Sequence, residues 1–196
     1  FNEITGELVG TPNNSQLGTS SNIMITVSDS EYSDTLTAFD ITVSNVNDSP
    51  TISGTPSTNV YEDAYYSFVP VAIDIDVGDV LEFSGTSIPS WATINETTGA
   101  LTGTPNNDDV GDFEDIIITV SDGDVNVNLT AFTITVKNTN DAPLAENVGV
   151  TLNEDESFEF NLLGSDEDEG DSLTYYIKTD TNKGSLIIDG DTATYV

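Results

Sequence analysis

The chain has 196 residues, with 35 acidic side chains against three lysines and no arginine, and a formal net charge of −32. Such a charge excludes nucleic acid as a direct partner, because two polyanions repel one another unless cations intervene. The absence of cysteine excludes disulfides and thiolate metal sites, and the absence of histidine removes the usual zinc ligand and the commonest general base. No apolar stretch approaches the roughly 18 residues that a membrane span needs.

An internal repeat organises the chain. Residues 94–143 align without a gap to residues 1–50, and 28 of the 50 positions are identical, so the chain is a tandem array with a module of about 93 residues. An offset of 92 aligns the last segment with the middle one, for example Glu154-Asp155 with Glu62-Asp63. We expect a C-terminal half-module at residues 1–48, a complete module at 49–141 and the N-terminal part of another at 142–196. Because both ends fall inside a module, we expect the chain to be part of a longer protein.

Apolar side chains recur at every second residue, which is typical of half-buried strands. In the first segment the alternating runs are residues 23–27 and 39–43. In the middle segment we expect seven strands, at 57–61, 65–73, 80–87, 91–95, 100–104, 113–121 and 127–138. In the last segment the runs are 158–162 and 173–177. Turn pairs such as Asp122-Gly123 separate the runs, and no helical period is visible. The sequence therefore predicts an all-β fold of tandem Ig-like or cadherin-like Greek-key β-sandwiches joined end to end.

Aspartates, glutamates and asparagines gather in the connections between these strands. If successive strands alternate in direction, the connections of the middle module fall at two opposite poles. At the pole where the chain arrives, the sequence places Asn47, Asp48, Asp74, Asp76, Asp79, Asp122 and Asp124. At the pole where it departs, the sequence places Glu62, Asp108, Asp109, Asn138, Asn140 and Asp141, which would meet Asp166 and Asp168 of the next module.

Carboxylates that converge on one junction repel one another unless a hard cation lies among them. Calcium accepts six to eight oxygen ligands at flexible angles, whereas magnesium is less suited to a cage made only of protein atoms. The alternative explanation is that aspartate and asparagine occupy these loops because they favour turns. Turn preference accounts for single acidic residues better than for paired ones at both poles, so we favour calcium.

The linkers 45–50 and 138–143, which read Asn-Val-Asn-Asp-Ser-Pro and Asn-Thr-Asn-Asp-Ala-Pro, resemble the Asp-x-Asn-Asp-Asn-x-Pro linker of the cadherin superfamily. Asp74-Ile75-Asp76 and Asp166-Glu167-Asp168 resemble its Asp-x-Asp calcium motif, and Glu62 resembles the glutamate near the end of its first strand. Residues 88–91 (Ile-Pro-Ser-Trp) and 98–105 are similar to the dystroglycan-type cadherin-like and Ig modules of large bacterial surface proteins. The last segment, at 184–186 and 189–195, looks more like the tandem cadherin-like repeats of bacterial adhesins.

The resemblance implies calcium at the junctions, although the sequence departs from the cadherin pattern at some positions. Asn45 and Asn138 stand where cadherins have the first linker aspartate, and Thr-Pro-Asn-Asn replaces the cadherin Leu-Asp-Arg-Glu motif, so we do not expect three ions per junction. The first junction is expected to be weaker, because Ser15 and Gln16 stand where Asp108 and Asp109 do. The candidate ligands are Asn45, Asn47, Asp48, Glu62, Asp74, Asp76, Asp108, Asp109, Asp122, Asn138, Asn140, Asp141, Asp166 and Asp168.

These observations favour a non-catalytic, extracellular or cell-surface segment: a calcium-stiffened stalk or spacer of a large adhesin or secreted protein. The alternative is a calcium-dependent carbohydrate-binding module of a polysaccharide-active protein, which would need exposed aromatic side chains. Trp91 is the only tryptophan, and we expect it in the core. An enzyme is disfavoured, because no histidine, cysteine or arginine is present to activate a substrate. The expected partners are calcium ions, cell-surface glycans or proteins bound through other parts of the full chain, and a head-to-tail copy joined by strand addition.

Overall fold

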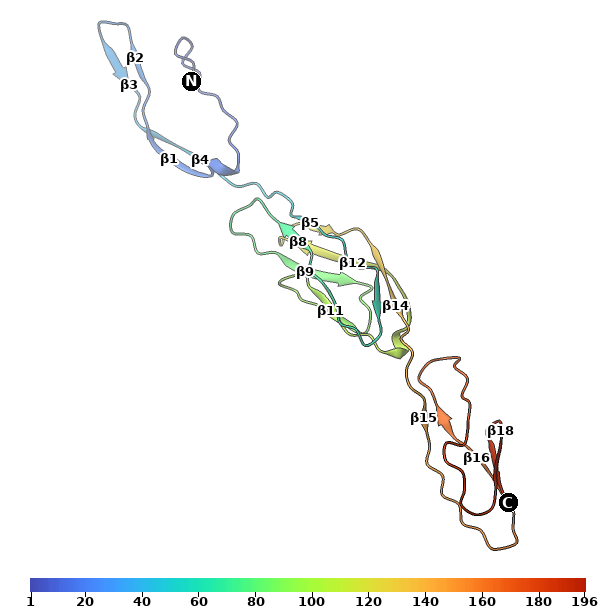
Figure 1. Ribbon diagram of the computed structural model, residues 1–196. Coiled ribbons are helices and arrows are strands. Elements are labelled where there is room, and N and C mark those ends of the chain that lie inside the picture. The colour runs from blue at the N-terminus through green and yellow to red at the C-terminus, as the bar shows by residue number, and fades with distance from the viewer. The chain divides into compact units, whose positions relative to one another are not determined.

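Short β-strands joined by loops make up nearly all of the regular structure in this computed structural model, which describes residues 1–196. The only helices are two single 3₁₀ turns, η1 (Asn14–Gln16) and η2 (Asn107–Asp109). No helix is long and apolar enough to cross a membrane. The strands, which Figure 1 shows in chain order, are β1 (Gly18–Ile23), β2 (Thr26–Ser28), β3 (Ser33–Thr35), β4 (Phe39–Val43), β5 (Thr51–Ser53), β6 (Asn59–Tyr61), β7 (Tyr66–Phe68), β8 (Val71–Ile73), β9 (Glu82–Thr86), β10 (Ala92–Ile94), β11 (Leu101–Gly103), β12 (Gly111–Ser121), β13 (Asn126–Asn128), β14 (Phe132–Lys137), β15 (Leu144–Ala145), β16 (Phe158–Asn161), β17 (Gly164–Ser165), β18 (Leu186–Asp189) and β19 (Thr192–Tyr195).

The chain divides into two units. The first consists of Phe1–Pro56, Ser67–Thr102 and Glu114–Phe132, and the second of Ser57–Tyr66, Gly103–Phe113 and Thr133–Val196. Within the first unit, β1 pairs with β4, β2 with β3, and β5 with β8, all antiparallel. Thr119–Ser121 of β12 pairs antiparallel with both β9 and β13, so these two strands lie on opposite edges of β12.

Within the second unit, β6 and β14 form a parallel pair, with Asn59 opposite Thr135 and Tyr61 opposite Lys137. β15 pairs with β17, and β16, β19 and β18 form an antiparallel sheet in that order. The larger sheets have the strand orders β13-β12-β14-β6, with β9 also on β12, and β10-β11-β7. The all-β expectation is confirmed.

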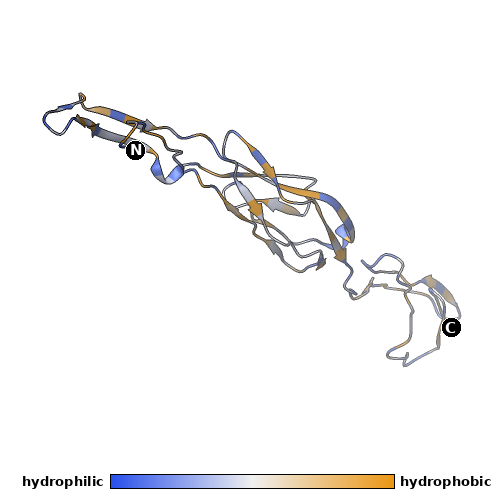
Figure 2. Ribbon diagram, turned by 90° about the horizontal axis from the view of Figure 1, so that it is seen from above, coloured by the Kyte–Doolittle hydropathy of each residue, from blue (hydrophilic) through white to orange (hydrophobic).

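The core is built from the alternating side chains of the central strands. Ile116, Ile118 and Val120 of β12 have no exposed surface, and neither does Ile134 of β14. Figure 2 shows hydrophobic residues concentrated on the strands of the middle segment. The period-two pattern thus predicted which face of these strands is buried, because successive side chains of a strand point to opposite faces.

The structure differs from the expected strands at several points. The expected strand 65–73 is two strands, β7 and β8, interrupted at Val69-Pro70, because proline has no N–H to donate to a ladder. The expected strand 127–138 is likewise divided into β13 and β14, and β5 was not expected. Residues 173–177 form no strand, although the alternation of half-buried and exposed side chains persists at 173–176. Alternation places side chains on two faces, but a strand also needs a hydrogen-bonded neighbour.

Burial is weaker than expected at other positions. Val27 is 71% exposed and Ile41 is 39% exposed, although both belong to the alternating runs of the first segment. Trp91, expected in the core, is half-buried. A regular alternation therefore indicates strand faces here without setting how deeply each side chain is buried.

Candidate calcium-binding junctions

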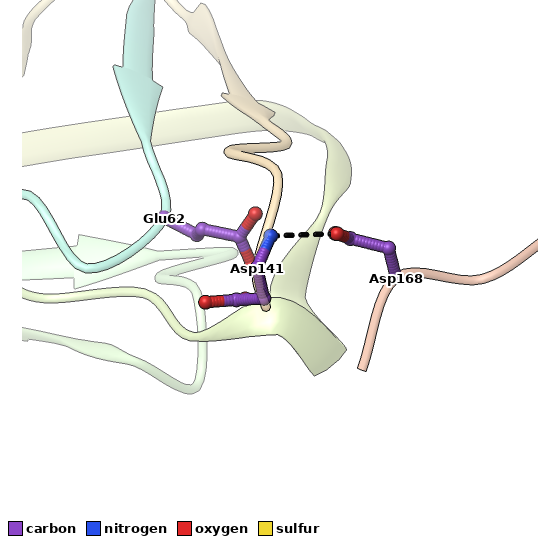
Figure 3. A group of neighbouring side chains, drawn as sticks. All are labelled: Glu62, Asp141 and Asp168. Atoms are coloured by element: carbon purple, nitrogen blue, oxygen red, sulfur yellow. Dashed lines mark hydrogen bonds between the residues drawn. The ribbon is translucent and has the colours of Figure 1, made fainter. Parts of the chain in front are cut away.

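Three carboxylates meet at the end of β6. Glu62 directly follows this strand, and its amide donates to the Lys137 carbonyl, 3.0 Å away, which continues the β6–β14 pairing. Ligand oxygens of Glu62, Asp141 and Asp168 all lie within 4.8 Å of one another. Figure 3 shows the three side chains approaching from separate segments of the chain. Glu62 and Asp168 are buried, at 3% and 6% exposure, and Asp141 is half-buried. All three belong to the second unit.

Backbone and amide groups of the linker hold these carboxylates in place. The Thr139 amide donates to Oε1 of Glu62. The Asp141 amide donates to Oδ2 of Asp168 at 2.7 Å, and Nδ2 of Asn138 donates to Oδ1 of Asp168 at 2.8 Å. One oxygen remains outside this network, because Oε2 of Glu62 is buried and has no hydrogen-bond partner.

The electrostatics of this group call for a positive charge. A buried charge is costly to desolvate unless it is paired, and three carboxylates this close also repel one another. The chain has only three lysines for 35 acidic residues, so its own cations cannot compensate its carboxylates in general. Oxygen donors in this arrangement suit a hard divalent cation, and calcium above all.

The two Asp-x-Asp loops repeat one local geometry. The Asp76 amide donates to Oδ1 of Asp74 at 2.8 Å, and the Asp168 amide donates to Oδ1 of Asp166 at 3.1 Å. In each loop a third aspartate, Asp79 or Asp171, completes a group of three carboxylates within 4.8 Å. The loop with Asp74 also contains a buried oxygen without a hydrogen-bond partner, Oδ2 of that residue.

The linker at Asn47 and Asp48 repeats the contacts of the second linker. The Asp48 amide donates to Oδ2 of Asp76 at 2.6 Å, as the Asp141 amide does to Asp168. Nδ2 of Asn47 donates to Oδ2 of Asp122 at 3.0 Å and to the Asp48 carbonyl at 3.1 Å. Asn140 makes the corresponding bond to the Asp141 carbonyl at 2.7 Å.

Two aspartates around the first Asp-x-Asp loop have pKa values shifted in opposite directions. Partial desolvation, followed by the negative charges of Asp74, Asp76, Asp122 and Asp124, raises the pKa of Asp79. Hydrogen bonds from the Val125 amide and the Asn47 side chain, in that order, lower the pKa of Asp122. The negative charges around Asp79 thus add to the effect of desolvation on its pKa, and a bound cation would oppose both.

Eight of the candidate ligands lie outside the three carboxylate groups, and three of these eight, Asn45, Asp108 and Asp109, also make none of the contacts described above. Oδ2 of Asp109 accepts a 3.0 Å hydrogen bond from the Asn106 amide, within the capping box of η2. Asp108 is exposed and lines a pocket with Asn106, Asn107 and Glu167. Asn45 is also exposed and belongs to none of the groups.

The structure places two further asparagines at the junction loops, and neither was among the ligands predicted from the sequence. Nδ2 of Asn14 donates to Oδ2 of Asp48 at 3.1 Å and to Oδ1 of Asp76 at 3.0 Å. The equivalent Asn107 donates through Nδ2 to the Glu167 carbonyl. The signal was present in the sequence, since both residues end a Thr-Pro-Asn-Asn segment that is identical in the two repeats. Its preceding asparagine caps η1 or η2 and so orients the second one.

Comparison with known families identifies two Ig-type domains in the chain. Residues 49–137 match the family described as "Putative Ig domain", and residues 140–196 match the family described as "Bacterial Ig domain". The two matched segments agree with a tandem of Ig-like β domains over residues 49–137 and 140–196. Ig-type repeats are typically non-catalytic, and neither match is to a catalytic domain. No curated protein matches the chain.

Several solved structures are similar to the chain. A crystal structure described as a "putative alpha-galactosidase" from Bacteroides fragilis is 12% identical, with a TM-score of 0.38, over 49% of this chain and 19% of that one. The human desmocollin-1 ectodomain is 18% identical, with a TM-score of 0.38, over 84% of this chain and 33% of that one. The protocadherin gammaB4 extracellular domain is 16% identical, with a TM-score of 0.39, over 94% of this chain and 36% of that one. The chain therefore spans about a third or less of the length of these structures.

Proposed function

We propose that the chain is a segment of an extracellular tandem-repeat protein whose module junctions bind calcium, and that the bound ions stiffen the connection between successive modules. The modules are residues 1–48, 49–141 and 142–196, and the ligands are the junction residues named above, with Glu62, Asp141 and Asp168 at the centre of the second junction. The observation that carries the proposal is Glu62: a carboxylate 3% exposed, with one oxygen unpartnered, beside two further carboxylates.

The spacing of the three carboxylates supports this assignment. Calcium binds oxygen at about 2.3–2.6 Å, so two oxygens on one ion are separated by at most about 4.6–5.2 Å. Ligand oxygens of Glu62, Asp141 and Asp168 lie within 4.8 Å of one another, which meets that limit. These side chains supply only part of the six to eight oxygens, so the side-chain and backbone oxygens of the linker, together with water, would complete the shell.

Stiffening follows from where the ligands lie in the sequence. Glu62 directly follows β6 of the middle module, Asp141 belongs to the linker, and Asp168 belongs to the loop after β17. An ion bound to all three joins segments up to 106 residues apart, and it restricts the backbone freedom of the linker between them. A stalk or spacer that holds a distal part of a surface protein away from the cell is the role that such rigid junctions serve.

Calcium titration by isothermal calorimetry tests the proposal. The wild-type chain is expected to bind calcium with a Kd of about 10⁻⁴ to 10⁻³ M, the range of extracellular calcium modules. Glu62→Gln is expected to lose the binding event of the second junction. Glu159→Gln, which makes the same change at an exposed position of β16, is the matched control and is expected to retain it.

A second measurement addresses stiffness. In small-angle scattering, EDTA is expected to broaden the distribution of interatomic distances, and calcium is expected to restore it in the wild type but not in Glu62→Gln. Identical titrations for wild type and Glu62→Gln, or scattering and melting curves that ignore EDTA, would defeat the proposal.

A further inference from the structure

Exposed aliphatic side chains form a row along β8 and the loop that joins it to β9. Val71 and Ile73 of β8 are 58% and 63% exposed, and in the loop Ile75, Val77 and Val80 are 63%, 95% and 73% exposed. Figure 1 shows this loop extending beyond the ends of β8 and β9. Single exposed apolar residues are ordinary on protein surfaces, whereas five within ten consecutive residues mark a candidate interaction site. We call these five residues the aliphatic row.

The calcium motif does not require aliphatic residues at these positions. The last segment carries the same motif at an offset of 92, with Asp166, Asp168 and Asp171 in place of Asp74, Asp76 and Asp79. Residues 71–80 and 163–172 also have the same pattern of buried, half-buried and exposed positions. The positions equivalent to the aliphatic row are occupied by Leu163, Ser165, Glu167, Glu169 and Ser172.

Four of these five equivalents are polar, as is usual at exposed positions. The two loops share their backbone pattern and their carboxylates, so neither folding nor cation binding explains aliphatic side chains in one of them. The remaining explanation is that the aliphatic row is covered by a partner, which removes its apolar surface from water.

Charge decides which kind of partner fits. The loop carries three carboxylates, Asp74, Asp76 and Asp79, with oxygens within 4.8 Å of one another, and the Asp48 carboxylate shares the donor Asn14 with Asp76. A second copy of the chain would bring another charge of −32 against them, and an anionic membrane would be repelled in the same way. A surface that carries lysine or arginine around its own aliphatic side chains complements both the charge and the polarity.

We propose that the aliphatic row is a docking surface for a protein partner that presents aliphatic side chains flanked by lysine or arginine. Docking does not need calcium, but the proposed function adds a consequence. Calcium at Asp74, Asp76 and Asp79 neutralises the carboxylates that attract the partner, so calcium and the partner weaken each other's binding by the same factor. Self-association or contact with anionic lipid would show the opposite dependence, because calcium relieves the repulsion that opposes both.

The proposal is tested by titrating a labelled model peptide of alternating lysine and valine with the whole chain and following its fluorescence anisotropy. A peptide of alternating lysine and serine is the control for purely electrostatic binding. The double substitution Ile75→Ser and Val77→Ser is expected to weaken binding of the lysine–valine peptide about tenfold or more. Tyr176→Ser, at a position 79% exposed and outside any strand, is expected to leave binding unchanged. The melting temperature of each variant shows that the fold is retained.

The outcomes separate the possible occupants. Equal binding of both peptides, or equal binding by wild type and the double variant, overturns the proposal. Binding of phosphatidylserine vesicles also overturns the proposal if calcium strengthens it and the double variant loses it. The same holds for self-association measured by light scattering. If the lysine–valine peptide binds through the aliphatic row but calcium has no effect on it, docking stands and the cation site at Asp74, Asp76 and Asp79 is refuted.

Discussion

Glu62→Gln is expected to stabilise the chain in a chelator and to destabilise it, relative to wild type, in calcium. Without an ion, the Glu62 carboxylate lies within 4.8 Å of Asp141 and Asp168. Two unit charges at that separation repel by about 3 kcal/mol at an effective dielectric constant of about 20, and solvent at the half-buried Asp141 reduces one of the two terms. The glutamine side chain has nearly the same shape, and its oxygen still accepts from the Thr139 amide. This hydrogen bond weakens by about 1 kcal/mol, because its acceptor is no longer charged.

The balance favours the variant by about 2 kcal/mol in the absence of calcium, which corresponds to about 10 °C in melting temperature for a domain of this size. In calcium the order reverses. An ion at about 100 times its Kd stabilises the folded wild type by about 2.7 kcal/mol, and the variant forfeits most of this because it has lost a charged ligand. The effect of one substitution thus changes sign with the ion, which loss of packing alone cannot produce.

Thermal unfolding is followed by circular dichroism in about 10 mM EDTA and in about 100 mM calcium, a concentration about 100 times the weakest expected Kd. Glu159→Gln is the control and is expected to change the free energy of unfolding by less than about 0.5 kcal/mol in either condition. If Glu62→Gln lowers the melting temperature equally with and without calcium, the carboxylate is stabilised by protein contacts alone and the reasoning is refuted.

Three further predictions concern the linker, the core and the pH dependence. Asn107→Ala, which removes a bond that positions the Asp166–Asp168 loop, should weaken calcium binding in calorimetry about tenfold, whereas an unchanged Kd would show that this contact is incidental. Ile118→Ala should lower the free energy of unfolding in urea by about 2–5 kcal/mol, because the side chain has no exposed surface. A loss below about 1 kcal/mol would contradict the described core. Val27→Ala, at a position 71% exposed, is the control. Burial raises the pKa of Tyr66 from 10.0 to about 12, so the protonated phenol contributes stability that is fully present below pH 10 and lost as the pH rises through about 12. Tyr66→Phe should therefore reduce the fall in urea midpoint between these pH values, and an equally steep fall would contradict this assignment.

Local patterns in the sequence determine much of the fold. The alternation at 116–120 and 132–136 predicts strands and their buried faces, because a strand places successive side chains on opposite sides whatever it pairs with. The Asp-x-Asp loops are local as well, since each is closed by a hydrogen bond between residues two apart. The interruption at Pro70 was also predictable from the residue type.

Pairing between distant segments was not predictable from such patterns. The parallel alignment of β6 with β14 joins residues 76 apart in the chain, and no local signal specifies it. The contact of Asn14 with Asp76 spans 62 residues, which is why a repeated Thr-Pro-Asn-Asn segment did not by itself indicate a junction residue.

Glu62 and Glu154 show most directly where the sequence stops and the tertiary structure begins. Both precede an aspartate in the same motif, and Asp63 and Asp155 adopt the same left-handed turn, with φ of 58° and 67°. The sequence therefore determined the turn and the chemistry of the carboxylate at both positions. Only the tertiary structure made Glu62 buried while Glu154 remains exposed, because loss of water depends on which distant segments pack around a side chain. At Glu62 those segments include the linker and a loop that carries a further aspartate, and their convergence turns a common acidic residue into a candidate ligand.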